Sequence, residues 1–197
     1  MSVLWKVSDL VFINILYIIC CLPIVTIGAA TTALYYTTLK LTEDRGSSAI
    51  KSFLKAFKDN FKQGTIIWMI LLLAGLLLVA DYFILNMMGG YAAIKILLGI
   101  PVLIVCITLI YVFPLLARFE NTVKKTLENA FLLGIAHLPK SVVMLVISVL
   151  PFLGCVVELS IIPIILSIGF SGVAYLNSLF LVRIFKKLEP ETEEEQS

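Results

Sequence analysis

The chain has 197 residues, of which 60% are hydrophobic and 14% are charged, and its mean hydropathy is +1.06. These values exclude a soluble globular protein and predict an all-α polytopic membrane protein. At ~20 residues per span, the length allows about five spans in one integral domain, predicted over residues 1–188. Residues 189–197 hold five glutamates and are predicted to be a solvated, disordered tail. The formal net charge of +2 says little by itself, so the positions of the basic residues matter more.

The first apolar stretch, residues 10–39, is longer than one span and must therefore tilt or bend. Pro23 supplies a bend because it removes one backbone hydrogen bond, and Thr26 is close enough to bond the freed backbone groups. Small residues four apart then allow another helix to approach closely: Gly28 with Thr32, and Ala29 with Ala33. Two interpretations stay open, a kinked packing helix or a broken helix that lines a substrate path.

Residues 48–63 form a predicted amphipathic helix that lies in the membrane interface. At 100° per residue, its lysines fall within an arc of about 60°, and its apolar residues fill a neighbouring arc of about 100°. The lysines would reach anionic headgroups while the phenylalanines sink among acyl chains, and the alternative is a docking surface for a partner protein. The residues assigned to this surface are Lys51, Lys55, Lys58, Lys62, Phe53, Phe57 and Phe61. Nucleic-acid binding is excluded, because the basic arc borders a lipid-seeking face.

The second and third spans are predicted over residues 64–87 and 91–117, joined by a tight hairpin at Met88-Gly89-Gly90. Asp81 and Lys95 lie at similar distances from this hairpin, and an unpaired aspartate inside a span is costly, so an ion pair between them is expected. A role in ion or proton coupling is the alternative, with Asn14 on the first span as a third member. A substrate or ion path would therefore involve Asn14, Pro23, Thr26, Asp81 and Lys95.

A second interfacial helix is predicted over residues 121–138, followed by a fourth span over 141–157 and a fifth over 161–185. The basic residues alternate cleanly between the connections, with six in residues 40–63 and none in the hairpin after the second span. By the positive-inside rule, both interfacial helices and the C-terminus are expected in the cytoplasm and the N-terminus outside.

Catalytic chemistry finds no support in the residue pattern. The four cysteines lie in apolar runs without a CxxC pair, and His137 is the only histidine, so no metal site is predicted. No nucleophile with a neighbouring base and no glycine-rich phosphate loop is present. We therefore predict no enzyme activity, no catalytic residue and no cofactor.

Three strings give the chain a resemblance to a known family: LPIVTIGAATTALYYTTLKL, FLKAFKDNFKQGTIIW and PLLARFENTVKKTLENAFLLGIAHLP. They resemble the bacterial YesL-like family, an integral membrane family catalogued as domain of unknown function 624. The resemblance implies a multi-pass protein of the bacterial inner membrane with five helices. It also suggests a link to carbohydrate uptake and polysaccharide degradation, and it supplies no catalytic residues.

Two functions follow as expectations. The first is an accessory component of a carbohydrate uptake or utilisation system, whose partners are the lipid bilayer with its anionic headgroups and either a membrane transporter or a second copy of the chain. The second is a small self-contained transporter or channel, with Asp81 near the path.

Overall fold

The computed structural model describes residues 3–44, 48–89, 92–157 and 162–188, and within these ranges a few helix side chains, including that of Lys95, lie outside the description. The described chain is helical throughout and contains no strand, which confirms the all-α fold class. The helices are α1 (Val3–Cys21), α2 (Ile27–Thr42), α3 (Ala49–Asp59), α4 (Phe61–Met87), α5 (Ala92–Arg118), α6 (Val123–Ala136), α7 (Leu138–Val157), α8 (Ile162–Ile164) and α9 (Phe170–Phe185). A 3-10 turn, η1 (Ile24–Thr26), precedes α2, and a π-helical segment, η3 (Ile165–Gly169), precedes α9. The predicted tail, 189–197, lies outside the described residues.

Three helical stretches of the described chain are long and apolar enough to cross a membrane: Phe61–Met87, Ile96–Arg118 and Ile165–Phe185. A fourth is obtained if Val123–Ala136 and Leu138–Pro151, which meet at a bend of 103°, form one broken span. These stretches show a polytopic membrane protein. They fall where the second, third and fifth spans are predicted, and α7 falls on the fourth.

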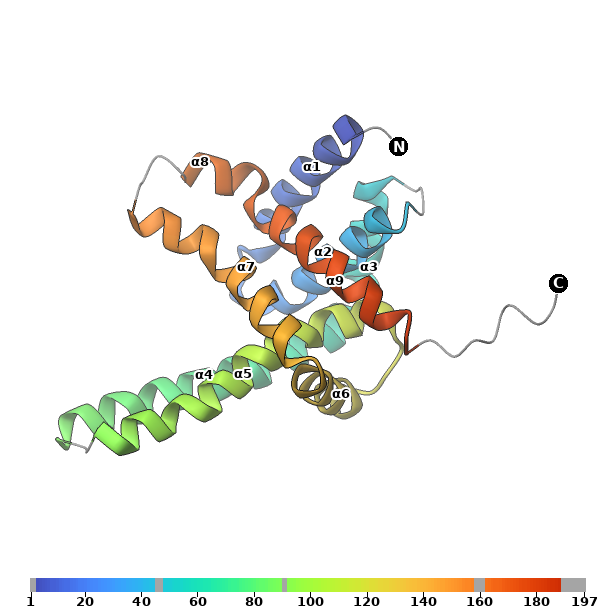
Figure 1. The fold of residues 1–197 in the computed structure, drawn as a ribbon. Coiled ribbons are helices and arrows are strands. Elements are labelled where there is room, and N and C mark those ends of the chain that lie inside the picture. Colours follow the sequence, from blue (N-terminus) through green and yellow to red (C-terminus); the bar gives the residue numbers. More distant parts are fainter. Residues whose placement is uncertain (1–2, 45–47, 90–91, 158–161, 189–197) are drawn as a thin grey trace.

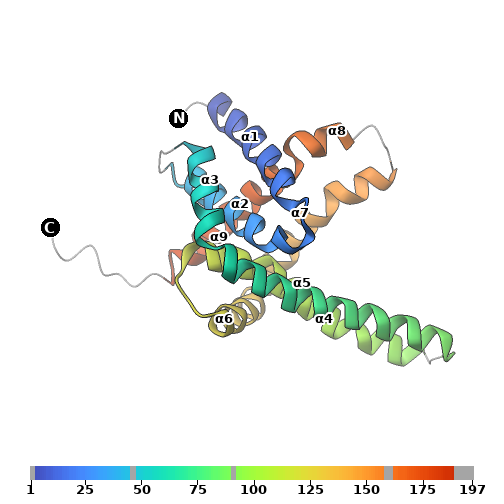
Figure 2. The ribbon, with the colours of Figure 1, turned by 180° about the vertical axis from the view of Figure 1, so that it is seen from behind.

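The predicted single span over residues 10–39 is wrong, because the chain reverses direction at Pro23. Helix α1 ends just before Pro23, and the turn η1 and then helix α2 follow it. Lys6 near the start of α1 forms an ion pair with Asp44 beyond the end of α2, with 2.8 Å between Nζ and Oδ1, and Tyr17 Oη lies 3.3 Å from Thr31 Oγ1. The two helices are therefore an antiparallel hairpin, whose arms lie against each other in both ribbon views (Figures 1 and 2).

This hairpin also brings the start of α1 close to the 48–63 segment. Lys6 and Asp44 are in contact, and α1 packs against α3, so the start of α1 lies at the same end of the molecule as α3. The Lys6 ammonium, through a hydrogen bond, lowers the pKa of the exposed Asp44 carboxyl. Arg118 at the end of α5 binds the neighbouring Glu43, with 2.7 Å between Nη1 and Oε2. The polar ends of three helices thus converge on Glu43 and Asp44.

Helix α2 lies in the middle of the molecule and packs against α1, α3, α4, α5 and α9. Its small residues allow these close contacts, as the spacing around Gly28 predicts. A Cβ atom added at Gly28 would lie 2.2 Å from the carbonyl oxygen of Gly64 in α4, and one added at Gly64 would lie 2.9 Å from the Cα of Ala29. The α2–α4 crossing therefore depends on glycine at both positions.

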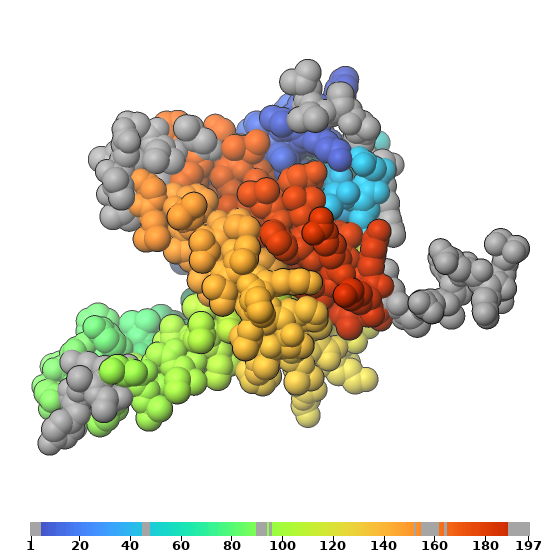
Figure 3. Space-filling model, in the orientation of Figure 1, coloured from blue at the N-terminus to red at the C-terminus, as the bar shows by residue number. Residues whose placement is uncertain are grey.

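Helices α4 and α5 continue well beyond this core as a two-helix arm, which we define as residues 72–87 and 92–106. With 27 residues, α4 is about 40 Å long. The arm projects away from the other helices (Figures 1 and 3), and none of its described side chains is buried. Gly89, with a φ of 67°, ends α4 in the left-handed conformation that glycine adopts without strain.

Candidate functional site

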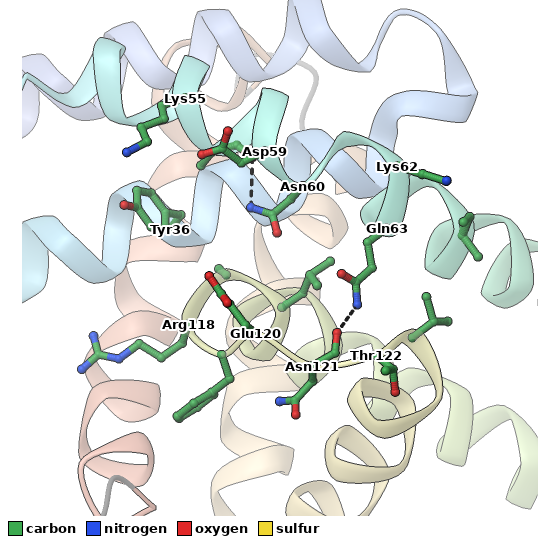
Figure 4. A pocket seen from close by; sticks show the side chains of 16 residues that line it. Tyr36, Lys55, Asp59, Asn60, Lys62, Gln63, Arg118, Glu120, Asn121 and Thr122 are labelled. Atoms are coloured by element: carbon green, nitrogen blue, oxygen red, sulfur yellow. Dashed lines mark hydrogen bonds between the residues drawn. The ribbon is translucent and has the colours of Figure 1, made fainter. Parts of the chain in front are cut away.

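A large groove with a mixed polar and apolar lining lies between the junction of α3 with α4 and the connection from α5 to α6, with Tyr36 of α2 between them. Its volume is about 1020 Å³. One wall carries Lys55, Asp59, Asn60 and Gln63, and the facing wall carries the segment from Arg118 to Thr122 (Figure 4). We call this the interfacial groove, because it lies where α4 begins and α5 ends.

Two direct contacts hold the interfacial groove together: one joins its two walls, and the other joins one wall to the end of α2. Gln63 donates a side-chain hydrogen bond to the backbone carbonyl of Asn121 across the groove (Figure 4). The Arg118–Glu43 ion pair, with exposed side-chain fractions of 13% and 5%, anchors the end of α5 to the end of α2. The chain turns sharply after Arg118, and Thr122 then caps α6 by accepting a hydrogen bond from the Lys125 backbone. The groove is therefore a fixed feature of the fold.

Charged groups of both signs line the interfacial groove. The side chains of Asp59 and Glu120 come from opposite walls, and Lys55 and Lys62 also line it. Within the described part of the chain, neither carboxylate has an ion-pair partner. Such a lining suits a ligand that carries both a positive and a negative group.

The predicted lysine surface on α3 is exposed, but its aromatic residues behave differently from expectation. Lys51, Lys55, Lys58 and Lys62 are all exposed. The prediction that Phe53 inserts into lipid is wrong. Its exposed fraction is 0%, because α3 packs this face against α2. Phe57 is half-buried; its ring lies nearly parallel to that of Phe53 and edge-on to that of Phe61. Of the three rings, Phe61 alone is exposed.

The predicted substrate path is not assembled in the described structure. Asn14 is fully buried and binds the η3 and α9 backbone, and Thr26 binds the backbone carbonyls of Cys20 and Pro23. Pro23 is on an exposed turn, which Trp68 of α4 fastens by a 2.8 Å hydrogen bond to the Ile24 carbonyl. Asp81 is exposed on the arm, 13 residues or about 20 Å further along α4 than Trp68. The side chain of Lys95, the expected partner of Asp81, lies outside the described residues.

A second hollow, about 470 Å³ in volume, lies on the arm between α4 and α5. Its lining is apolar apart from the Tyr82 hydroxyl, and Gly75 and Gly99 contribute bare backbone, since a Cβ atom at either would meet nothing within 4 Å. The residues that line this arm groove are Gly75, Leu78, Val79, Tyr82, Leu98, Gly99, Val102, Val105 and Cys106. It is a surface into which an apolar side chain of a neighbouring helix would fit.

Comparison with protein families identifies a match to a model described as "Protein of unknown function, DUF624", over residues 10–82. This part of the chain is therefore similar to the DUF624 family. No curated protein and no solved structure matches it significantly.

The matched region begins within α1 and covers the rest of the α1–α2 hairpin, α3 and most of α4. It contains the Gly28–Gly64 crossing and the wall of the interfacial groove that carries Asp59 and Gln63. It also reaches Asp81 and one side of the arm groove. Among the described residues, no cluster of histidine, cysteine and acidic side chains could hold a metal ion.

Proposed function

We propose that this protein is a non-enzymatic accessory component of the bacterial cytoplasmic membrane that binds another membrane protein through the arm. The observation that carries this proposal is that no described side chain of the arm is buried, and no other helix of the described chain packs on the arm groove. A transporter that works alone would instead gather its polar residues around one path, and Asn14, Pro23 and Asp81 lie on separate parts of the molecule.

The chemistry of the arm favours a particular occupant, a transmembrane helix with a basic residue near its outer end. Gly75 and Gly99 leave room for a bulky apolar side chain. Asp81 is exposed on the same arm, next to Tyr82 of the groove, and a carboxylate at a helix contact in a membrane is stabilised by a cationic or hydrogen-bonding partner. A carbohydrate uptake system is the proposed setting of this partner, in line with the resemblance described above.

The proposal is tested by filling the arm groove. We expect the double variant Gly75→Leu/Gly99→Leu to stay folded and monodisperse in mild detergent but to lose the co-purifying membrane protein by about tenfold, because the added side chains occupy its binding surface. Gly172→Leu on α9 is the matched control, since a Cβ atom there also meets nothing within 4 Å. A photo-cross-linker at Val102 should capture a membrane helix that carries lysine or arginine. Retention of the same partner by the double variant, or capture of a second copy of this chain alone, would contradict the proposal.

The orientation of the protein in the membrane is proposed from the convergence of its basic helix ends. Lys6, Arg118 and the end of α9 lie at the same end of the molecule as α3, as the Lys6–Asp44, Arg118–Glu43 and Phe119–Phe185 contacts indicate. The positive-inside rule then favours the cytoplasm for both the N-terminus and the C-terminus.

This orientation predicts which cysteines a membrane-impermeant maleimide can label. In a variant without the native cysteines, Ser8→Cys and Ser48→Cys should react only in inverted vesicles, whereas Met88→Cys at the arm tip should react in intact spheroplasts. All three positions have exposed side chains, so differences in labelling report the side of the membrane. Labelling of Ser8→Cys together with Met88→Cys would overturn the proposed orientation.

A further inference from the structure

The interfacial groove lies at the depth of lipid headgroups. Two stretches with membrane-spanning length and composition end at it, one beginning at Phe61 and the other finishing at Arg118. The groove contains polar side chains from near these ends and apolar residues from inside the two stretches, namely Ile66 and Leu116, together with Val123 at the start of α6. A molecule bound there would therefore face water or headgroups on one side and the beginning of the hydrocarbon on the other.

The charges of the groove favour a ligand with an ammonium group. Glu120 points into the groove from one wall, and Asp59 lies on the facing wall with its carboxylate on the side of Lys55 (Figure 4); neither has an ion-pair partner within the described residues. The nearby amides of Asn60 and Gln63 belong to the same lining. A primary ammonium can donate three hydrogen bonds, and carboxylates are its strongest acceptors among side chains.

A negative group on the same ligand would find its partner at the rim. Lys55 lines the groove on the side of Asp59, is exposed and forms no ion pair within the described chain, whereas the Lys62 side chain points away from the two carboxylates (Figure 4). A purely anionic headgroup would meet the two carboxylates, whereas a quaternary ammonium would have no hydrogen to donate to them. The volume of about 1020 Å³ lies at the upper end of the ~300–1,000 Å³ that ligand pockets usually have.

We propose that the interfacial groove binds the headgroup of a phospholipid that carries a primary ammonium next to its phosphate, as phosphatidylethanolamine does. Asp59 and Glu120 bind the ammonium, Lys55 binds the phosphate, and the apolar residues below contact the glycerol and the first acyl carbons. This site is distinct from the outer lysines of α3, Lys51 and Lys58, which do not line the groove. It does not depend on the partner proposed for the arm.

The test measures which lipids stay bound. The full-length protein is reconstituted in nanodiscs that contain equal amounts of phosphatidylethanolamine, phosphatidylglycerol and phosphatidylcholine, then released into mild detergent, and retained lipids are counted by native mass spectrometry. Phosphatidylethanolamine should be enriched about tenfold over each of the other two, since one class alone satisfies both sets of charges. Asp59→Asn/Glu120→Gln should abolish the enrichment, whereas Glu128→Gln, on the exposed Lys124–Glu128 pair of α6, should leave it unchanged.

Three results would overturn the proposal. One is equal retention of phosphatidylglycerol, and another is enrichment that survives in the double variant. The third is displacement of the lipid by soluble glycerophosphoethanolamine at an equal concentration, which would assign the groove to a free amine phosphate in place of a lipid. If the double variant does not fold, the single variant Glu120→Gln decides, because Glu120 is exposed outside any helix and it should lower the enrichment about threefold.

Discussion

Replacement of Gly28 by alanine is expected to prevent the protein from folding to a monodisperse state. The added Cβ would lie 2.2 Å from the Gly64 carbonyl oxygen and 2.5 Å from the Trp68 Cβ, and the carbonyl is backbone that cannot rotate away. Helices α2 and α4 would have to separate, and α2 packs against most of the other helices. Overpacking of this kind costs about 1–3 kcal/mol or more, a large share of the stability of a domain.

The measurement is the yield of monodisperse protein in mild detergent together with its apparent unfolding temperature. Gly64→Ala should behave similarly, because its Cβ would lie 2.9 Å from the Ala29 Cα. Gly75→Ala on the arm is the control and should fold normally, since nothing lies within 4 Å of its Cβ position. Equal yields and unfolding temperatures for Gly28→Ala and Gly75→Ala would mean that the close α2–α4 crossing does not exist.

Much of this packing could be predicted from the sequence. The four-residue spacing of small side chains after Pro23 indicated a face that another helix could approach closely, and that face is where Gly28 meets Gly64. The direction of the chain could not be predicted in the same way. Hydropathy reports the length of an apolar stretch, and a proline within it predicts a bend but not its size. The full reversal depends on contacts between distant residues, such as Lys6 with Asp44.

Only one wall of the candidate site could be predicted from the sequence. The periodicity of α3 correctly indicated that its lysines are exposed, because a helical period separates the two faces of a helix. The same period cannot say whether the apolar face meets lipid or protein, so Phe53 was assigned to lipid although it is buried. The second wall of the interfacial groove, with Glu120 and Asn121, comes from a connection 58 residues further on from Gln63, and only the folded chain brings it there.

Replacement of Asn14 by leucine is expected to loosen the beginning of α9. The Asn14 amide donates to the Leu166 carbonyl over 2.7 Å, and its oxygen accepts from the Ser171 backbone N–H over 2.9 Å. Leu166 lies in η3 and Ser171 follows it in α9, where π-helical pairing interrupts the regular α-helical pattern, so the α1 side chain supplies hydrogen bonds to this irregular segment. Leucine has a similar size but leaves both groups unpaired, at about 1–3 kcal/mol for each.

Amide hydrogen exchange tests this role directly, because a purely apolar contact between α1 and α9 would predict unchanged protection when leucine replaces asparagine. We expect residues 166–171 to exchange faster in Asn14→Leu, while α2 and α3 keep their protection, since local opening there requires less than global unfolding. Asn129→Leu is the control, as Asn129 is exposed on α6 and its substitution should change neither segment. Faster exchange throughout Asn14→Leu would show that Asn14 supports the whole fold, and unchanged exchange at 166–171 would remove its assigned role. The buried asparagine that the sequence suggested for a path is, on this reasoning, the residue that holds an irregular helix in place.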